Sequence, residues 1–227
     1  MTFIWSSAEL NRKTYRVNKI RALLEEHSKH AFNLGLVRGS SGNMSMRADA
    51  ASFFITASGK SLGDITSRDI VRCRIDKDRP GKKASMEWGL HSGIYRKRND
   101  AYAVFHSQPL YSTLIACAKD KKIKTALIPE AIAYIGKIEV VQYRHAGSVE
   151  LAEKCAEGAR KADVLLLENH GVVAFAGSIE EAVNMTLTFE FLCRLNVLSK
   201  TAGMDLKEIS PRQARDFLKQ LGAARKA

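Results

Sequence analysis

Short segments rich in β-branched and aromatic residues alternate along this chain with longer segments whose apolar residues recur at helical spacing. Four to five such residues bounded by turn residues are typical of strands, whereas apolar residues at i, i+3 and i+4 are typical of helices. The strand-like segments are 53–56, 71–75, 103–106, 164–167 and 172–176. Their alternation with helical segments indicates an α/β protein.

Capping residues mark where several helices begin. In the pattern Ser-x-x-Glu, the serine oxygen accepts a backbone N–H three residues on and the glutamate reaches back. The pattern occurs at 6–9, opening a helix that we expect to end at Gly35, and at 178–181, opening a long helix that we expect to end at Gly203. Further helices are expected over 85–98 and after Pro109, Ser148 and Ser210.

The composition is that of an ordinary globular protein. The chain has 227 residues, 45% hydrophobic and 26% charged, and shows no internal repeat or linker, so we predict one domain over residues 1–227. No segment approaches the ~20 apolar residues of a membrane helix, and residues 1–6 lack the pattern of a signal peptide. We therefore expect a cytoplasmic protein without a membrane partner.

The charge and the cysteines narrow the class of function. The formal net charge is +12, but the basic residues are dispersed, and the densest clusters, 119–124 and 212–226, contain no interleaved aromatic residues. This pattern disfavours nucleic acid and fits either a small anionic substrate or a solvated basic surface. The four cysteines form no C-x-x-C pair and lie among apolar neighbours, so we expect reduced, buried core residues and no zinc knuckle.

Two loops of small residues are candidate anion sites. Residues 40–43 and 58–60 combine glycine with serine, so that backbone N–H groups can converge on an anion, and Lys60 adds a positive charge. Ordinary tight turns explain the same residues.

Glu87 and His91 lie four residues apart and share a helix face. Beside Trp88, Glu87 is a candidate acid/base with a raised pKa. The alternative is a solvated glutamate in the first turn of a helix.

Candidate metal ligands lie at the ends of strands. His106 and Gln108 are two residues apart, so in a strand they point the same way. His170 lies between two strand-like segments. Histidine there is a common metal ligand, although a lone histidine is often only hydrogen-bonded.

Taken in order, five segments resemble the class II aldolase/adducin family, whose members include L-fuculose-1-phosphate aldolase. The segments are 35–45, 55–59, 85–91, 103–106 and 169–173, and the resemblance runs from about Leu10 to Thr201. Five motifs in the family's order are far more specific than any one of them. The resemblance implies a three-layer α/β/α sandwich around a mostly antiparallel sheet, a divalent metal cofactor, a small phosphorylated substrate, and homotetramers with active sites between neighbouring subunits.

The resemblance also implies roles for individual residues. Glu87 matches the catalytic acid/base, and His106 and His170 match two metal ligands. The residues matching substrate or phosphate binders are Gly42, Asn43, Ser58, Gly59 and Ser85.

Two departures from the family pattern alter these expectations. The family has H-x-H where this chain has His106-Ser107-Gln108. An amide oxygen is a poorer donor to zinc than imidazole, so Gln108 opens the site to Mn, Co, Fe or Mg, although the family favours zinc. Met86 stands where the family has a second phosphate-binding serine, which makes a smaller anion such as a carboxylate plausible.

We therefore expect a metal-dependent lyase that performs retro-aldol C–C cleavage of a phosphorylated sugar or sugar acid through a metal-stabilised enediolate, with Glu87 moving the proton. A sugar-acid phosphate decarboxylase passes through the same intermediate and is the first alternative. The second is a non-catalytic, adducin-like interaction module. Gln108 favours that module, whereas Glu87, His106 and His170 together argue against it.

Overall fold

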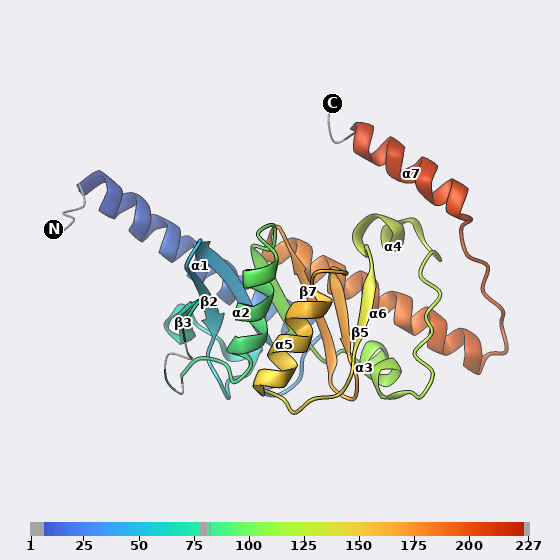
Figure 1. The fold of residues 1–227 in the computed structure, drawn as a ribbon, viewed down its shortest axis with the longest axis horizontal. Coiled ribbons are helices and arrows are strands. Elements are labelled where there is room, and N and C mark those ends of the chain that lie inside the picture. Colours follow the sequence, from blue (N-terminus) through green and yellow to red (C-terminus); the bar gives the residue numbers. More distant parts are fainter. Residues whose placement is uncertain (1–6, 78–80, 82, 225–227) are drawn as a thin grey trace.

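The computed structural model, which describes residues 7–77, 81 and 83–224, is built on a seven-stranded sheet with the order β3-β2-β1-β4-β7-β6-β5 (Figure 1). All neighbouring strands pair antiparallel except β5 and β6, which pair parallel at one edge. The expectation of a mostly antiparallel sheet is confirmed, with one parallel pair. The strands are β1 (Asn43–Asp49), β2 (Ser52–Thr56), β3 (Ile70–Arg74), β4 (Ala103–Ser107), β5 (Ile138–Val141), β6 (Val164–Leu167) and β7 (Gly171–Ala176).

Helices cover both faces of this sheet. The α-helices are α1 (Ser7–Asn33), α2 (Trp88–Lys97), α3 (Leu110–Cys117), α4 (Pro129–Tyr134), α5 (Val149–Gly158), α6 (Ile179–Thr201) and α7 (Pro211–Ala224). Two short 3-10 helices, η1 (Leu62–Asp64) and η2 (Ser67–Asp69), lie between β2 and β3. The predicted cap at Ser6 and part of the predicted turn 76–83 lie outside the described residues.

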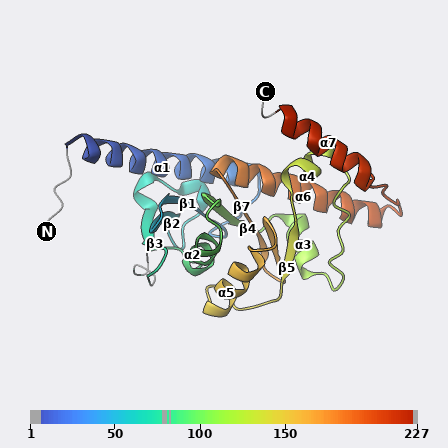
Figure 2. The ribbon, with the colours of Figure 1, turned by 45° about the horizontal axis from the view of Figure 1, so that its top comes forward.

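The alternation of side chains along the strands separates two cores. Val104 faces the core beneath α2 and α5, whereas the next residue, Phe105, faces the core beneath α1 and the start of α6. The far end of the second face packs against α3, α4 and the rest of α6. Figure 2 shows α1 and α6 along one side of the sheet and α2 and α5 along the other. The predicted α/β/α sandwich is confirmed.

Three predicted local features differ from the structure. The helix expected over 85–98 begins only at Trp88, because Ser85 N–H donates to the Thr56 carbonyl at 3.2 Å and holds this stretch against β2. Cys117 is exposed at the end of α3, whereas the other three cysteines are buried as expected. Asn43, assigned to a loop, is the first residue of β1.

The caps expected at Ser148 and Ser178 are present. Each serine oxygen accepts the backbone N–H three residues on, at 3.1 Å in both cases. These bonds satisfy N–H groups that the first turn of a helix leaves free. Among the described helices, none has the length and apolar character needed to cross a bilayer.

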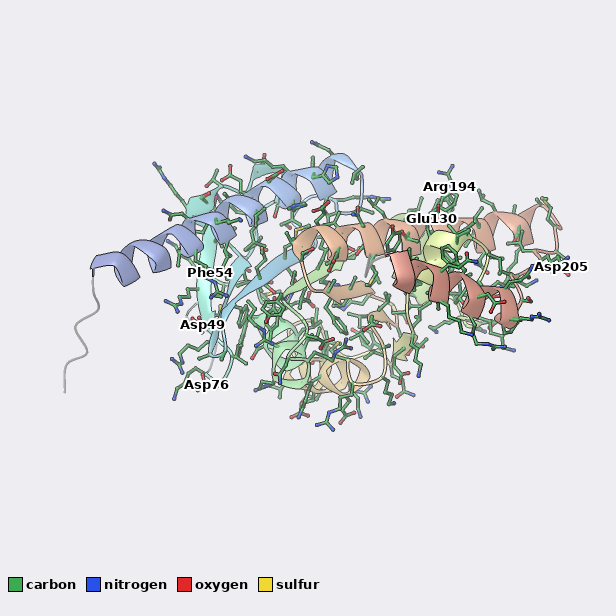
Figure 3. The ribbon with its side chains drawn as sticks, turned by 90° about the horizontal axis from the view of Figure 1, so that it is seen from above. Asp49, Phe54, Asp76, Glu130, Arg194 and Asp205 are labelled. Atoms are coloured by element: carbon green, nitrogen blue, oxygen red, sulfur yellow. The ribbon has the colours of Figure 1, made fainter. Side chains whose placement is uncertain are left out.

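The segment before α7 is tied to the chain between α3 and α4. Lys124 Nζ contacts Asp205 Oδ1 at 2.6 Å, and Ile209 N–H donates to the Ala126 carbonyl at 2.7 Å. Figure 3 shows Asp205 at one end of the molecule, far from Asp49 and Asp76. These contacts direct α7 back onto α4.

Candidate metal centre

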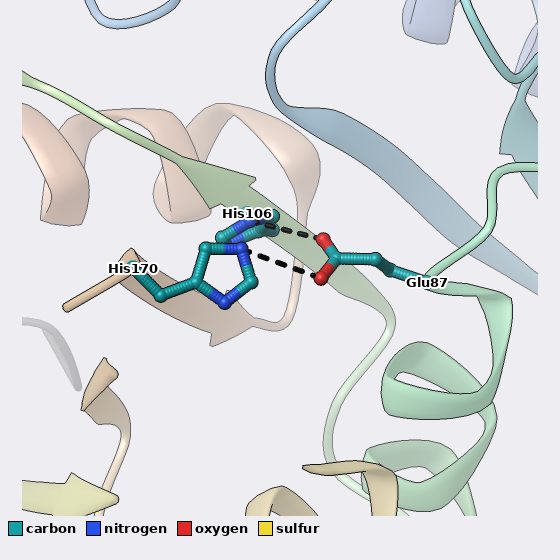
Figure 4. Close-up of side chains that lie close together, drawn as sticks. All are labelled: Glu87, His106 and His170. Carbon is teal, nitrogen blue, oxygen red and sulfur yellow. Dashed lines mark ion pairs between the residues drawn. The ribbon is translucent and has the colours of Figure 1, made fainter. Parts of the chain in front are cut away.

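Three side chains from different elements converge where the central strands of the sheet end (Figure 4). Glu87 is the N-cap residue of α2, His106 is the penultimate residue of β4, and His170 lies in the turn between β6 and β7. Their potential ligand atoms all lie within 4.8 Å of one another. His106 Nε2 is 3.0 Å from Glu87 Oε2, and His170 Nε2 is 3.4 Å from Glu87 Oε1.

Two glycines allow the neighbouring strand ends to approach β4 this closely. A Cβ on Gly171 would lie 2.5 Å from the Ser107 carbonyl oxygen, which is backbone and cannot swing away. Gly42 has a φ of +79°, and a Cβ there would lie 3.0 Å from the His106 carbonyl oxygen. Glycine at these positions therefore brings the start of β1 and the His170 turn against the end of β4.

Glu87 is buried, with 6% of its surface exposed, so the interpretation as a solvated helix-start glutamate is wrong. Burial raises the pKa of Glu87, but His106, then His170 and an N–H of Asn43, outweigh it and hold the pKa well below its ordinary value. The expected raised pKa is therefore also wrong. The residue that lowers this pKa most, His106, comes from β4 and is not part of the local sequence 85–91.

The pKa values of the two histidines shift in opposite directions. Burial lowers the pKa of His106, but the facing Glu87 carboxylate and the Val172 carbonyl, at 3.0 Å from Nδ1, outweigh burial and raise it. Burial, together with His106, lowers the pKa of His170 to about 4, so His170 is neutral near pH 7. The bond from Nδ1 to Val172 also fixes the His106 ring with Nε2 directed into the cluster, the orientation that a metal ligand requires.

The side-chain amide of Gln108 also lies at the cluster of Glu87, His106 and His170. Its Nε2 lies 2.7 Å from His106 Nε2, and turning the amide over places Oε1 there instead without changing its shape. Gln108 Oε1 and Glu87 Oε1 are both buried and have no hydrogen-bond partner among the described residues. Two imidazoles, a carboxylate and an amide with unpartnered oxygens fit a divalent cation, whose tetrahedral ligands lie about 3.4 Å apart for metal–ligand bonds of about 2.1 Å.

Residues 22–197 match the family described as Class II Aldolase and Adducin N-terminal domain. The chain belongs to this family. The L-fuculose phosphate aldolase of Methanocaldococcus jannaschii is 36% identical over 163 residues, which cover 72% of this chain and 87% of the relative. The 3-oxo-tetronate 4-phosphate decarboxylase of Haemophilus influenzae is 27% identical over 179 residues, which cover 77% of this chain and 85% of the relative. A solved L-fuculose 1-phosphate aldolase aligns with a TM-score of 0.80 at 26% identity and covers 90% of this chain and 96% of that one.

In this class II aldolase/adducin chain, the loops expected to bind an anion lie beside the metal cluster. Ser85 Oγ accepts the Glu87 N–H at 3.2 Å, and Ala84 pairs with Ala57. Ser58 is therefore one residue from this pairing, and its N–H donates to the Lys83 carbonyl at 2.9 Å. Gly59 follows with a left-handed φ of +74° and is exposed.

Two side chains in these segments, Lys60 and Met86, contribute little charge or hydrogen bonding for an anion. Lys60 Nζ pairs with Asp69 Oδ1 at 2.8 Å, so its charge is already partly compensated. Met86, next to Gly147 and to Glu87 in sequence, is 57% exposed, and its thioether side chain donates no hydrogen bond.

The sequence interpretation missed a buried polar network behind Glu87. Asn43, expected to bind substrate, uses its carboxamide to contact both Glu87 and His91. Ser45 and Tyr95 continue the contacts into the core. The sequence did contain a sign of this network, because polar residues occupy every second position of β1 and every fourth position from the cap of α2 onward.

Proposed function

We propose that this chain is a divalent-metal-dependent lyase that cleaves a C–C bond of a small phosphorylated sugar or sugar acid in a retro-aldol reaction. The observation that supports this most is the convergence of buried Glu87 and His106 with partly exposed His170. The relatives named as phosphate-sugar aldolases support the reaction and the substrate class.

The residues of the cluster have separate tasks. Glu87 is ionised, and its Oε1 is buried without a hydrogen bond, so this oxygen takes up the proton and returns it during the reaction. His106, His170 and the amide oxygen of Gln108 hold the cation. When bound, a divalent cation supplies positive charge that stabilises the negative charge developing on the substrate oxygens.

Zinc is the metal that we propose first, because two imidazole nitrogens and a carboxylate are typical zinc ligands. The Gln108 oxygen makes Mn, Co, Fe or Mg an alternative, since oxygen ligands suit harder ions. The identity of the metal therefore depends on whether Gln108 contacts it.

We further propose that the loops beside the cluster hold the substrate's phosphate through backbone N–H groups and hydroxyls. The residues are Gly42, Asn43, Ser58, Gly59 and Ser85. The family resemblance supports a cytoplasmic homotetramer with active sites between neighbouring subunits.

A sugar-acid phosphate decarboxylase is the second candidate. Exposed Met86 offers no hydrogen-bond donor to a phosphate, and the Haemophilus influenzae relative is named a decarboxylase. A non-catalytic, adducin-like module is disfavoured by the convergence of the acid/base candidate with two imidazoles.

Two measurements test the proposal. Metal analysis of purified, untagged protein should give about one divalent ion per chain. Phosphorylated ketoses and phosphorylated 3-oxo sugar acids, screened with each metal, should release an aldehyde if the protein is an aldolase and CO₂ if it is a decarboxylase. Protein that contains no metal, gains no thermal stability from any divalent ion and turns over no substrate would be an interaction module instead.

A further inference from the structure

Two rows of polar side chains face each other between β1 and α2. Asn43 and Ser45 lie two residues apart on β1, and Glu87, His91 and Tyr95 lie four residues apart from the cap of α2 onward. Two residues of a strand advance about 6.7 Å and four residues of a helix about 6 Å, so the rows stay in step. We call these five residues the polar ladder.

Each residue of the polar ladder contacts the next. Asn43 Nδ2 donates to Glu87 Oε2 at 3.2 Å, and Asn43 Oδ1 contacts His91 Nε2 at 2.5 Å. Ser45 Oγ lies 2.7 Å from His91 Nδ1 and 2.8 Å from the Tyr95 hydroxyl. His91 and Ser45 are 0% exposed and Asn43 is 7% exposed, so no bulk water replaces these bonds.

The chemistry of the groups fixes the direction of every hydrogen bond. The ionised carboxylate of Glu87 can only accept, so Asn43 must turn its NH₂ toward it and its oxygen toward His91. His91 must then carry its proton on Nε2, which leaves Nδ1 of the neutral ring to accept from Ser45. Ser45 in turn accepts from Tyr95.

This direction makes the two oxygens of Glu87 unequal. Oε2 receives the Asn43 N–H and faces His106 at 3.0 Å, whereas Oε1 is buried without a hydrogen bond. Without the His91 N–H, the Asn43 amide could rotate, and Oε2 would lose a donor held in place.

We propose that His91 is a positioning residue, which orients the Asn43 carboxamide so that Oε2 of Glu87 is occupied and Oε1 stays free for the cation and the transferred proton. The proposal rests on the role proposed above for Glu87. The competing explanation is that the polar ladder serves only to hold α2 against the sheet.

Two substitutions at position 91 separate these explanations. In His91→Gln, the amide nitrogen can take the place of Nε2 and still donate to Asn43. In His91→Asn, the shorter side chain can reach Ser45 but not Asn43. Each variant keeps one of the two hydrogen bonds of the His91 ring, so both variants should lose similar stability. Only His91→Gln should keep the Asn43 amide in place.

The readout is the affinity for Co²⁺, measured from its visible absorption in competition with a chelator, together with urea unfolding of the metal-free proteins. We expect His91→Asn to weaken Co²⁺ binding about 10- to 100-fold, as changes behind metal ligands do. His91→Gln should bind close to native. The positioning role is refuted if His91→Asn binds like native, or if both variants lose affinity in proportion to their lost stability.

A measurement on the native protein does not depend on the variants folding. The ¹⁵N spectrum of labelled histidine should show His91 as the neutral tautomer with its proton on Nε2. A proton on Nδ1 would refute the assigned hydrogen-bond directions and, with them, the positioning role of His91. Native protein that binds no Co²⁺ would refute the proposed function, and with it the role of His91. Native binding that His91→Asn leaves unchanged would refute the role of His91 alone.

Discussion

His106 Nε2 lies 3.0 Å from Glu87 Oε2, so a strand and the cap of a helix are joined through a buried ion pair. His106 is fully buried, and 8% of the Glu87 side chain is exposed. A buried charge whose partner is removed is strongly destabilising, so the two residues stabilise each other. Variants at this pair must therefore be judged by metal content and stability as well as by activity.

We predict that Glu87→Gln abolishes turnover while the protein still binds metal through His106, His170 and Gln108, although more weakly because the side chain at position 87 loses its negative charge. Glutamine matches the shape of glutamate but cannot take up a proton, and loss of a general acid/base costs about 10²- to 10⁴-fold in rate. The assay is cleavage of the substrate found by the screen, alongside metal analysis. Glu180→Gln, in the first turn of α6 and exposed, is the matched control. Simultaneous loss of the metal would mean that Glu87 is chiefly a ligand.

We predict that Gln108→His shifts metal preference toward zinc. The substitution places an imidazole beside His106 Nε2, where the Gln108 amide now lies at 2.7 Å. Zinc affinity should rise relative to manganese by about tenfold or more, the scale of single changes around metal sites. Competition with a chelator measures both affinities, and Gln142→His, at an exposed position after β5, is the control. An unchanged ratio would show that Gln108 does not contact the cation.

We predict that Gly171→Ala destabilises the fold. The added Cβ would meet the Ser107 carbonyl at 2.5 Å, and overpacking of this kind costs about 1–3 kcal/mol. Urea unfolding measures the loss, and metal affinity should fall because His170 is the adjacent residue. Gly222→Ala in α7 is the control, because nothing lies within 4 Å of its added Cβ. Equal stability of the two variants would contradict the prediction.

We predict that Glu25 contributes to stability in a pH-dependent way. Lys29 Nζ contacts its Oε1 at 2.7 Å, and the N–H and hydroxyl of Ser67 donate to its Oε2. The Lys29 contact first, then Ser67, lowers the pKa of Glu25 from 4.5 to about 2. Because the folded-state pKa is depressed, this contribution is present above pH 4.5 and is lost as the pH falls toward 2.

Urea unfolding at a series of pH values tests this. Glu25→Gln should be less stable than native at pH 7, and the difference should shrink between pH 4.5 and 2. Glu26→Gln, next in sequence and exposed, controls for the loss of one charge from α1. A difference that stays constant across this range would contradict the assignment.

The segments that form β2, β3, β4, β6 and β7 were predicted as strands, whereas β5 was not predicted and neither was β1. The residues of β1, Asn43 to Asp49, include no β-branched side chain, and the polar ones at alternate positions suggest a solvated face. In the structure, that face is turned toward α2. There, Ser45 forms hydrogen bonds with His91 and Tyr95 of α2. These partners are distant in sequence, so the local pattern of β1 does not reveal them.

The order of the motifs predicted that Glu87, His106 and His170 would meet, and the structure brings them together. Reasoning from the neighbours of Glu87 alone gave the wrong sign for its pKa, because the deciding charge comes from another strand. The single domain and the anion-binding roles of Ser58, Gly59 and Ser85 stay predictions.

The pairing of β4 with β7 also sets the order of events in synthesis. A growing chain cannot assemble this site before β7 has left the ribosome, since His170 comes just before that strand. Once the chain is complete, the buried Glu87 carboxylate already has His106 as its partner, so folding can finish before any ion arrives. The amount of folded chain and the fraction of it that holds an ion would then vary independently.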